Sequence, residues 1–179
     1  HLQPEPSNAI RKAARDYAIE NELDFFDIAE KEGFLRTLTI RISSTGEIMV
    51  LFQFFYEDES KRLGLLNYIK EKFPEITSLL YTINDKGNET IFDLDIITFS
   101  GADWIYEEME GLKFKIGPKS FYQTNSKQAY ELYKVTRELA QIEKNDIENF
   151  SDSRLKFIIN EYQNIIRLMK NTCELDEMN

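Results

Sequence analysis

The spacing of apolar residues changes from a helical to an alternating period within the first part of the chain. After Ser7, which is suited to be an N-cap, apolar residues recur at helical spacing and predict a helix with one buried face. The residues expected on that face are Ile10, Ala13, Ala14, Tyr17 and Ala18. From Phe34 to Ile42 the period is two, which predicts a half-buried strand: Phe34, Leu38, Ile40 and Ile42 share one parity, and Thr37, Thr39 and Arg41 share the other.

A second strand and a second helix follow. The turn-forming residues 43–46 and the nearly all-apolar run from Ile48 to Tyr56 predict a β-hairpin. Ser60 is expected to cap a helix that Pro74 ends. The apolar stripe predicted for this helix is Leu65, Leu66, Ile69 and Phe73.

Two more strands are predicted over residues 79–83 and 91–99, on either side of the turn-rich residues 84–88. The order of elements is then α-β-β-α-β-β. Such an order predicts a two-layer α+β domain, with two helices on one face of an antiparallel sheet, over residues 1–101.

The pattern changes beyond residue 101, and a second region is expected over residues 102–142. Residues 105–109 and 112–116 predict another hairpin, and residues 120–123 a short strand. A helix capped by Asn125 or Ser126 should follow. Its expected stripe is Ala129, Leu132, Tyr133, Thr136, Leu139 and Ala140.

Residues 143–179 form a third region with a polar linker, an amphipathic helix and an acidic tail. The apolar positions of the predicted helix, residues 153–169, fall on one stripe: Leu155, Ile158, Ile159, Tyr162, Ile165, Ile166 and Met169. In water, such an apolar stripe is expected to be buried against another apolar surface. It would pack within the chain or support self-association with a second copy.

Charge argues against strong, autonomous nucleic-acid binding. The 179-residue chain has 22 Lys and Arg against 32 Asp and Glu, for a net charge of −10, and acidic residues outnumber basic ones in each third. A protein that binds RNA phosphates tightly needs a basic surface. The 42% hydrophobic content supplies a core, and no apolar run approaches the ~18 residues of a membrane span.

Most catalytic arrangements are excluded by composition. The only histidine is His1, and no Gly-rich phosphate loop is present. The single cysteine, Cys173, excludes an internal disulfide, indicates a cytoplasmic protein, and lies among acidic residues that disfavour a thiolate. We therefore assign no catalytic residue and no metal ligand in this chain.

Two stretches nevertheless have features of a binding site. Arg36 has the parity of the apolar residues of its strand, so it needs a carboxylate or a ligand phosphate as partner. Residues 111–125 place three lysines, three aromatic residues and two amide side chains before a helix N-terminus, which favours anions. Spacing alone favours an ordinary strand–turn–helix connection for the second stretch.

These stretches resemble one enzyme family. Leu112-Lys113-Phe114 followed by Ser120-Phe121-Tyr122-Gln123-Thr124-Asn125 is similar to the F-x-Q-x-N entry to the methyltransferase domain of S-adenosylmethionine-dependent RNA (uracil-5-)-methyltransferases. The opening His1-Leu2-Gln3-Pro4-Glu5-Pro6-Ser7-Asn8, and Gly33-Phe34-Leu35-Arg36 through Arg41, resemble the family's central domain in the same order. The resemblance covers about residues 1–142.

The resemblance implies methylation of C5 of a uridine in rRNA or tRNA, with rRNA the favoured substrate. In that family a cysteine adds to C6 of the base, C5 takes the methyl group, and a base removes the C5 proton. Gln123 would bind S-adenosylmethionine, and Phe121, Arg36 and Arg41 would lie near the RNA. An amide suits the polar groups of the cofactor, and an aromatic ring stacks on an unpaired base.

The chain also departs from the family. The Gly-rich cofactor loop and the proline-flanked cysteine nucleophile should follow residue 142 and do not, so we expect the chain alone to be inactive. The parent enzyme could carry an iron–sulfur cluster, but its ligands would lie upstream. We therefore interpret the chain as part of a larger enzyme. It would provide the central domain, followed by the hairpin and helices at the edge of a methyltransferase domain. The alternative is a non-catalytic interaction or assembly domain derived from that family.

Overall fold

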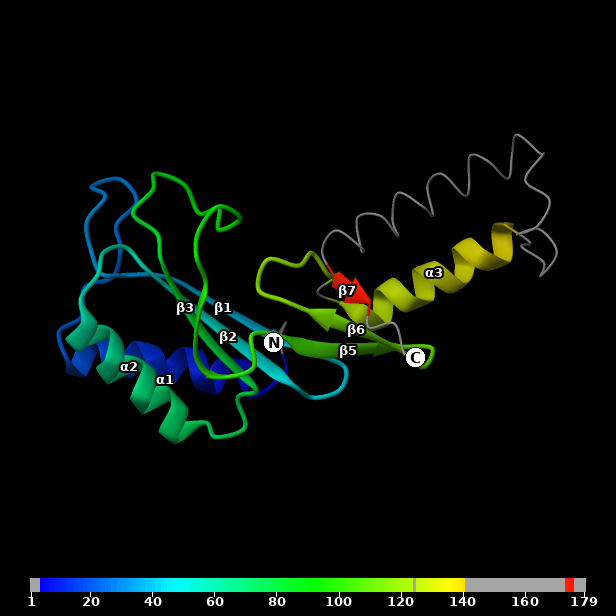
Figure 1. Cartoon of the computed structure of the whole chain (residues 1–179), viewed down its shortest axis with the longest axis horizontal. Helices are drawn as coiled ribbons and strands as arrows, with labels where there is room; N and C mark the ends of the chain where they lie inside the picture. The colour runs from blue at the N-terminus through cyan, green and yellow to red at the C-terminus, as the bar shows by residue number, and fades with distance from the viewer. Residues whose placement is uncertain (1–3, 124, 141–172, 176–179) are drawn as a thin grey trace. The chain divides into compact units, whose positions relative to one another are not determined.

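The computed structural model describes residues 4–123, 125–140 and 173–175, which belong to two compact units (Figure 1). The first unit extends to Glu107 and includes Gly117–Lys119. The second comprises Glu108–Ile116 and the residues from Ser120 onward.

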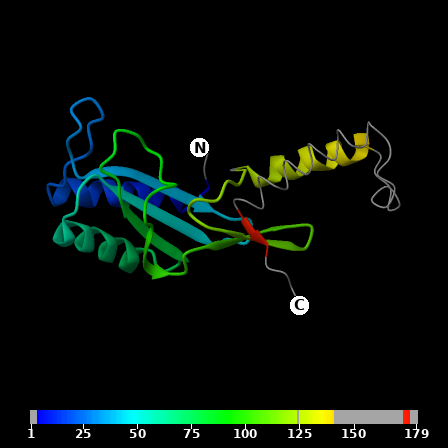
Figure 2. The ribbon, with the colours of Figure 1, turned by 45° about the horizontal axis from the view of Figure 1, so that its top comes forward.

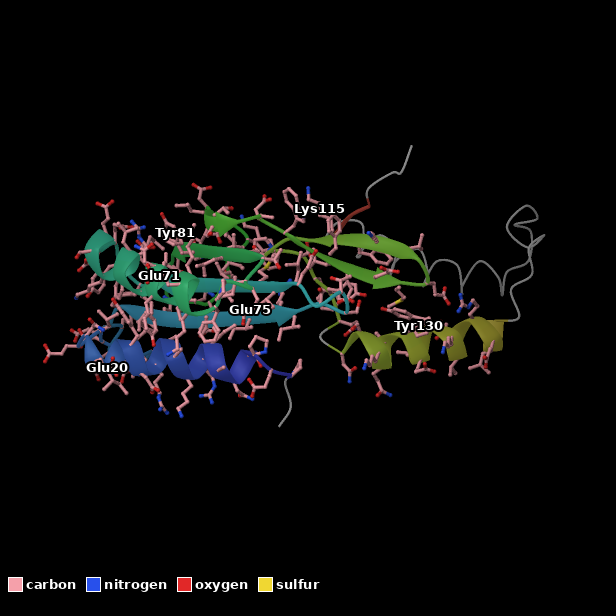
Figure 3. All side chains as sticks on the ribbon, turned by 90° about the horizontal axis from the view of Figure 1, so that it is seen from below. Glu20, Glu71, Glu75, Tyr81, Lys115 and Tyr130 are labelled. Carbon is pink, nitrogen blue, oxygen red and sulfur yellow. The ribbon has the colours of Figure 1, made fainter. Side chains whose placement is uncertain are left out.

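The first unit is an α+β structure with two layers of regular elements. Its four-stranded sheet has the order β1-β2-β3-β4, with β1 Leu35–Ile42, β2 Ile48–Phe54, β3 Ser78–Ile83 and β4 Ile97–Gly101. Helices α1, Ser7–Glu20, and α2, Glu59–Lys72, cover the same face of this sheet (Figures 2 and 3). The predicted fold class and element order are confirmed.

The sheet is antiparallel except for one pair, which corrects the prediction of a wholly antiparallel sheet. Strand β1 pairs antiparallel with β2, and β3 pairs antiparallel with β4, but β2 and β3 run parallel. Helix α2 is the reason. It follows β2 and carries the chain back along the sheet, so that β3 starts at the same end as β2.

The core lies between the sheet and the two helices. Even-numbered residues of β2 point toward the helices because side chains alternate along a strand. Burial of the stripes predicted for the first two helices is confirmed, with Tyr17 only partly buried. The stripe predicted for the third helix is not buried as a whole, because Ala129 is buried but Leu132 and Leu139 are exposed. The principal core residues are Ile10, Ala13, Ala14, Ala18, Phe34, Ile48, Val50, Phe52, Phe54, Leu65, Leu66, Ile69, Phe73 and Leu79.

Both helix starts differ from the predictions. Ser7 is the first residue of α1, where its buried hydroxyl donates to the carbonyl of Pro4 at 2.6 Å instead of capping the helix. Helix α2 is capped by Asp58, whose carboxylate accepts from the backbone N–H of Lys61 at 3.0 Å, and Ser60 is already inside the helix. Asp58 is the better cap because its charge also interacts favourably with the helix dipole.

Strand β4 begins at Ile97, six residues later than predicted. Residues 91–96 form turns instead, in which the N–H of Leu94 donates to the carbonyl of Ile91. The Thr82 hydroxyl donates to the carbonyl of Asp95 at 2.7 Å. The acidic residues of this segment are exposed, and it forms a long loop with residues 84–90 on the face of the sheet opposite the helices.

In the second unit the predicted hairpin is confirmed. Strands β5, Ile105–Met109, which begins in the first unit, and β6, Leu112–Ile116, are joined by Glu110 and Gly111, both with positive φ. Strand β7, Cys173–Leu175, pairs antiparallel with β6 and makes the sheet order β5-β6-β7. Helix α3, Ser126–Ala140, follows the hairpin.

The short strand predicted for residues 120–123 does not form. These residues lie outside the strands of the structure and form an irregular connection toward α3. The predicted amphipathic helix at residues 153–169 lies outside the described residues. Among the described helices, none combines the length and the apolar character that crossing a bilayer would require.

Candidate functional site

The segment that resembles F-x-Q-x-N presents its two candidate residues to solvent. Phe121 is 58% exposed and Gln123 is also exposed, whereas Tyr122 between them is half-buried. The ring of Tyr122 packs against the ring of Phe114 in β6, with the centroids 6.4 Å apart. Exposure therefore alternates along the segment, and Tyr122 anchors it to the hairpin.

Asn125 fixes the end of this segment at the start of α3. Its side-chain oxygen accepts from the N–H of Gln128 at 3.1 Å, and its carbonyl accepts from the N–H of Ala129. This is the geometry of an N-cap and confirms one of the two predicted caps. Gln123 is thus held two residues before a helix N-terminus, where backbone N–H groups favour anionic ligand groups.

An ion pair that the sequence pattern did not predict holds α3 to the hairpin. Arg137 donates from both terminal nitrogens to the carboxylate of Glu110, at 2.9 and 2.6 Å. The hydrogen bond from Arg137 lowers the pKa of Glu110 to about 2, with a further contribution from Tyr130. The available sequence signals were the Glu110-Gly111 turn and a basic residue near the end of the predicted helix, but neither identifies the partner.

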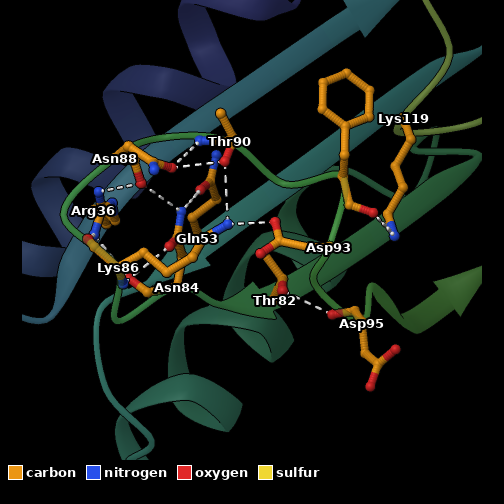
Figure 4. Close-up of polar contacts among 11 residues, drawn as sticks. Arg36, Gln53, Thr82, Asn84, Lys86, Asn88, Thr90, Asp93, Asp95 and Lys119 are labelled. Carbon is orange, nitrogen blue, oxygen red and sulfur yellow. Dashed lines mark hydrogen bonds and ion pairs between the residues drawn. The ribbon is translucent and has the colours of Figure 1, made fainter.

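Arg36 has partners other than those expected (Figure 4). Its guanidinium donates to three carbonyls, those of Asn84 at 2.8 Å, Lys86 at 2.6 Å and Asn88 at 2.7 Å. Its Cζ also lies 4.6 Å from the ring centroid of Phe26. The expectation of a carboxylate or a ligand phosphate is corrected: within the described residues, backbone oxygens and an aromatic ring hold this cation.

A β-bulge explains why Arg36 has these partners. The register between β1 and β2 shifts between Leu35 and Thr37, so Arg36 is the extra residue and its side chain is redirected. The guanidinium thereby reaches the loop after β3. That loop also rests on a buried amide pair, in which Asn84 donates to the side-chain oxygen of Gln53 at 2.9 Å.

Arg41 and Lys119 contact backbone oxygens of the first unit. Arg41 donates to the carbonyl of Gly117 at 3.3 Å, and Lys119 donates to the carbonyl of Phe92 at 3.1 Å. Arg36 and Arg41 belong to the first unit, and Phe121 and Gln123 to the second. Phe121 and Gln123 lie on one short segment, whereas Arg36 and Arg41 lie near opposite ends of β1 and contact different segments, so the structure does not bring the two arginines together. Among the described residues no group of three or more His, Cys, Asp or Glu side chains is arranged to hold a metal ion.

Comparison with known proteins gives a consistent result, although no family model matches the chain. The chain is 57% identical over 142 residues to an uncharacterized RNA methyltransferase of Bacteroides thetaiotaomicron, and 52% identical over 142 residues to one of Porphyromonas gingivalis. Each match covers 78% of this chain.

The structure resembles that of the Pyrococcus abyssi tRNA (uracil-54, C5)-methyltransferase in complex with S-adenosyl-L-homocysteine. The TM-score is 0.56 and the identity 26%, over 72% of this chain. The chain belongs to the RNA (uracil-5-)methyltransferase family.

The chain spans about a third of the length of these family members: 31% and 30% of the two relatives and 30% of the Pyrococcus chain. Local geometry explains why the glycine of Gly33-Phe34-Leu35-Arg36 is needed. Gly33 has φ +110°, and a Cβ there would lie 2.3 Å from the carbonyl oxygen of Phe25. In this RNA methyltransferase chain the motif therefore joins a constrained glycine to the bulge that directs Arg36.

Proposed function

We propose that this chain provides the central domain, residues 1–101, and the edge of the methyltransferase domain, residues 102–142, of an enzyme that methylates C5 of a uridine in RNA. The observation that carries the proposal is the joint exposure of Phe121 and Gln123 on a segment anchored by Tyr122 and Asn125. We favour rRNA over tRNA as substrate and the cytoplasm as the place of action.

Gln123 is the residue we assign to the cofactor. When bound, S-adenosylmethionine supplies the methyl group. The exposed amide of Gln123 offers both a donor and an acceptor, and the capped N-terminus of α3 follows two residues later. The described residues thus fit one edge of a cofactor site. The solved relative bound to S-adenosyl-L-homocysteine supports this assignment.

Phe121 is the residue we assign to the substrate base. An exposed aromatic ring on an anchored backbone can stack on a base that has left its helix, at little cost in side-chain entropy. Arg41 is the second RNA candidate. Arg36 contributes indirectly, because its guanidinium holds the loop over residues 84–88.

Methyl transfer by the chain alone is not expected, since its described residues provide neither a cysteine nucleophile in the family's setting nor a Gly-rich cofactor loop. Incubation with labelled S-adenosylmethionine and unmodified rRNA should leave the RNA unlabelled. Labelling at or above one methyl group per chain would contradict this. The rival function, a non-catalytic interaction or assembly domain, would also give no labelling, so a second experiment is required.

A chimera separates the two functions. Residues 4–140 replace the matching segment of the Bacteroides thetaiotaomicron relative, which 57% identity makes feasible. The chimera should form 5-methyluridine in rRNA from cells that lack the modification, detected by mass spectrometry of nucleosides. A folded chimera that methylates no uridine, or that methylates another position, would contradict the proposal.

Two substitutions in this chimera test the assigned roles. Gln123→Ala should raise KM for S-adenosylmethionine by about tenfold, because an amide–ligand hydrogen bond is lost. Phe121→Ala should lower kcat/KM for RNA while KM for the cofactor stays unchanged. Leu112→Ala, an exposed apolar position on β6, is the matched control and should change neither constant.

A further inference from the structure

Tyr122 lies between the two residues assigned to the ligands and differs from both in its contacts. Phe121 and Gln123 are exposed, whereas Tyr122 is half-buried. Its ring packs on the ring of Phe114, with a centroid distance of 6.4 Å, and Phe114 is itself only 9% exposed in β6. The residue that F-x-Q-x-N leaves unspecified is therefore the one that attaches this segment to the hairpin.

The hairpin holds the chain on both sides of the α3 N-terminus. Residues 120–123 lie outside the strands, so their position depends on side-chain packing more than on backbone pairing. Beyond them, Asn125 caps α3, and Arg137 binds Glu110 in the hairpin turn. All these residues belong to the second unit. Among these attachments, Tyr122 is the one that lies between the two ligand residues.

Methyl transfer to a base makes the relation between these two residues important. The reacting atoms must be held about 3–3.5 Å apart, and a misplacement of about 1 Å can cost about a hundredfold in rate. The residue that stacks on the base and the residue that binds the cofactor must therefore keep a fixed arrangement. Only Tyr122 separates Phe121 from Gln123, and its two soft backbone dihedrals set how their side chains are directed. Fixing the ring of Tyr122 restrains these dihedrals.

We propose that Tyr122 is a positioning residue that holds Phe121 and Gln123 in one arrangement, through the packing of its ring on Phe114. It acts through its two neighbours and touches neither ligand. Because this role rests on the proposed function of Phe121 and Gln123, it adds the residue that joins their two sites. One substitution at Tyr122 should therefore impair both sites, whereas a substitution at Phe121 or Gln123 impairs one.

The order of the segment is measured in the full chain without ligands. In nitrogen-15 relaxation experiments, the N–H order parameters of Phe121 and Gln123 should be about 0.85, as in rigid backbone, and should fall below about 0.6 in Tyr122→Leu. Phe114→Leu should have the same effect. Tyr122→Phe keeps the ring and is the matched control, with order parameters as in the unsubstituted chain. Low values in the unsubstituted chain, or unchanged values in Tyr122→Leu, would overturn the proposal.

Kinetics in the chimera with the Bacteroides thetaiotaomicron relative test the connection between the two sites. Tyr122→Leu should raise KM for S-adenosylmethionine and KM for RNA by about fivefold each, and Tyr122→Phe should change neither by more than about twofold. KM does not depend on the fraction of active enzyme, so a loss of stability alone would leave both constants unchanged. A rise in only one constant, or in neither, would show that Tyr122 does not join the sites.

Double variants determine whether Tyr122 acts through its neighbours. Added to Gln123→Ala, Tyr122→Leu should raise KM for S-adenosylmethionine no further, because the contact that it positions is already lost. Added to Phe121→Ala, it should likewise leave KM for RNA unchanged. Fully additive effects would contradict the positioning role. If the single variants Gln123→Ala and Phe121→Ala change neither constant, the proposed function itself is wrong; if they act as expected and Tyr122→Leu does not, only the positioning role is wrong.

Discussion

Arg36 shows how one side chain connects segments that are distant in sequence. Three carbonyls that lie 48 to 52 residues further along accept its hydrogen bonds, and the ring of Phe26 lies against its guanidinium. Lysine has one nitrogen and no planar fork, so it cannot reach these three oxygens in the same geometry. Arginine is therefore required here for structure.

We expect Arg36→Lys to lower the free energy of unfolding by about 2 kcal/mol, since hydrogen bonds from a charged donor are lost in a partly buried place. Urea unfolding followed by circular dichroism measures the change. Arg15→Lys, whose exposed side chain pairs only with its neighbour Asp16 among the described contacts, should change it by less than about 0.5 kcal/mol. Equal effects of the two substitutions would refute the structural role.

Gly33 supports a second prediction at the scale of one residue. Gly33→Ala should destabilise the protein by about 1–3 kcal/mol, because φ is +110° and a methyl group would collide with the backbone of Phe25. Gly87→Ala is the matched control: a Cβ there meets no atom within 4 Å. The same urea titration measures both, and a tolerated Gly33→Ala would show that the 24–33 loop can move away.

At the scale of elements, α3 and the β5–β6 hairpin are joined by the Glu110–Arg137 pair. The pair lowers the pKa of Glu110 from 4.5 to about 2. A carboxyl group whose pKa is lower in the folded state stabilises that state above the unfolded pKa, and the stabilisation is lost as pH falls through the folded value.

The stability of the second unit should therefore decline between about pH 4.5 and pH 2. Glu110→Gln should reduce this decline, while Glu131→Gln, in an exposed pair within α3, should not. The Glu110 side-chain carbon signal, followed by NMR against pH, measures the pKa directly. A midpoint near 4.5 would show that the ion pair does not form in solution.

The elements themselves could be predicted from sequence more fully than their connections. Period and turn residues suffice for a hairpin such as β5–β6, because they act within a few residues. The Asp58 cap was missed because both Asp58 and Ser60 are residues that can cap a helix, and the geometry of the preceding chain decides between them. The late start of β4 depends on Thr82 binding the carbonyl of Asp95, a contact across 13 residues that no local pattern contains.

In the candidate site too, local features could be predicted from sequence, whereas contacts between distant segments could not. Phe121, Gln123 and Asn125 could be named from a local motif, and the structure shows the first two exposed and the third capping α3. Arg36 was found by its parity, but a bulge between Leu35 and Thr37 changed its partners. Bulges arise from pairing between strands, so single-strand alternation cannot predict them.

At the scale of the whole molecule, the distribution of charge determines how strongly the chain can bind RNA. Residues 22–33 carry five acidic residues and one lysine, and residues 84–96 carry four acidic residues and one lysine. These two loops therefore hold seven of the ten net negative charges, and each of the nine acidic side chains is exposed. Phosphates are repelled from both loops, which leaves few places where the first unit could hold RNA.

We therefore expect the isolated chain to bind RNA weakly, with a Kd above about 1 μM near physiological salt, and with affinity that falls further as salt rises. Few phosphates can be neutralised, so the slope of log K against log salt should be small. Fluorescence anisotropy with a labelled rRNA fragment at several salt concentrations measures both quantities. Submicromolar binding would contradict the prediction and would direct attention to Arg41 and Lys113–Lys119. Arg41→Gln should then reduce the slope by about one phosphate contact, while Arg15→Gln should leave it unchanged.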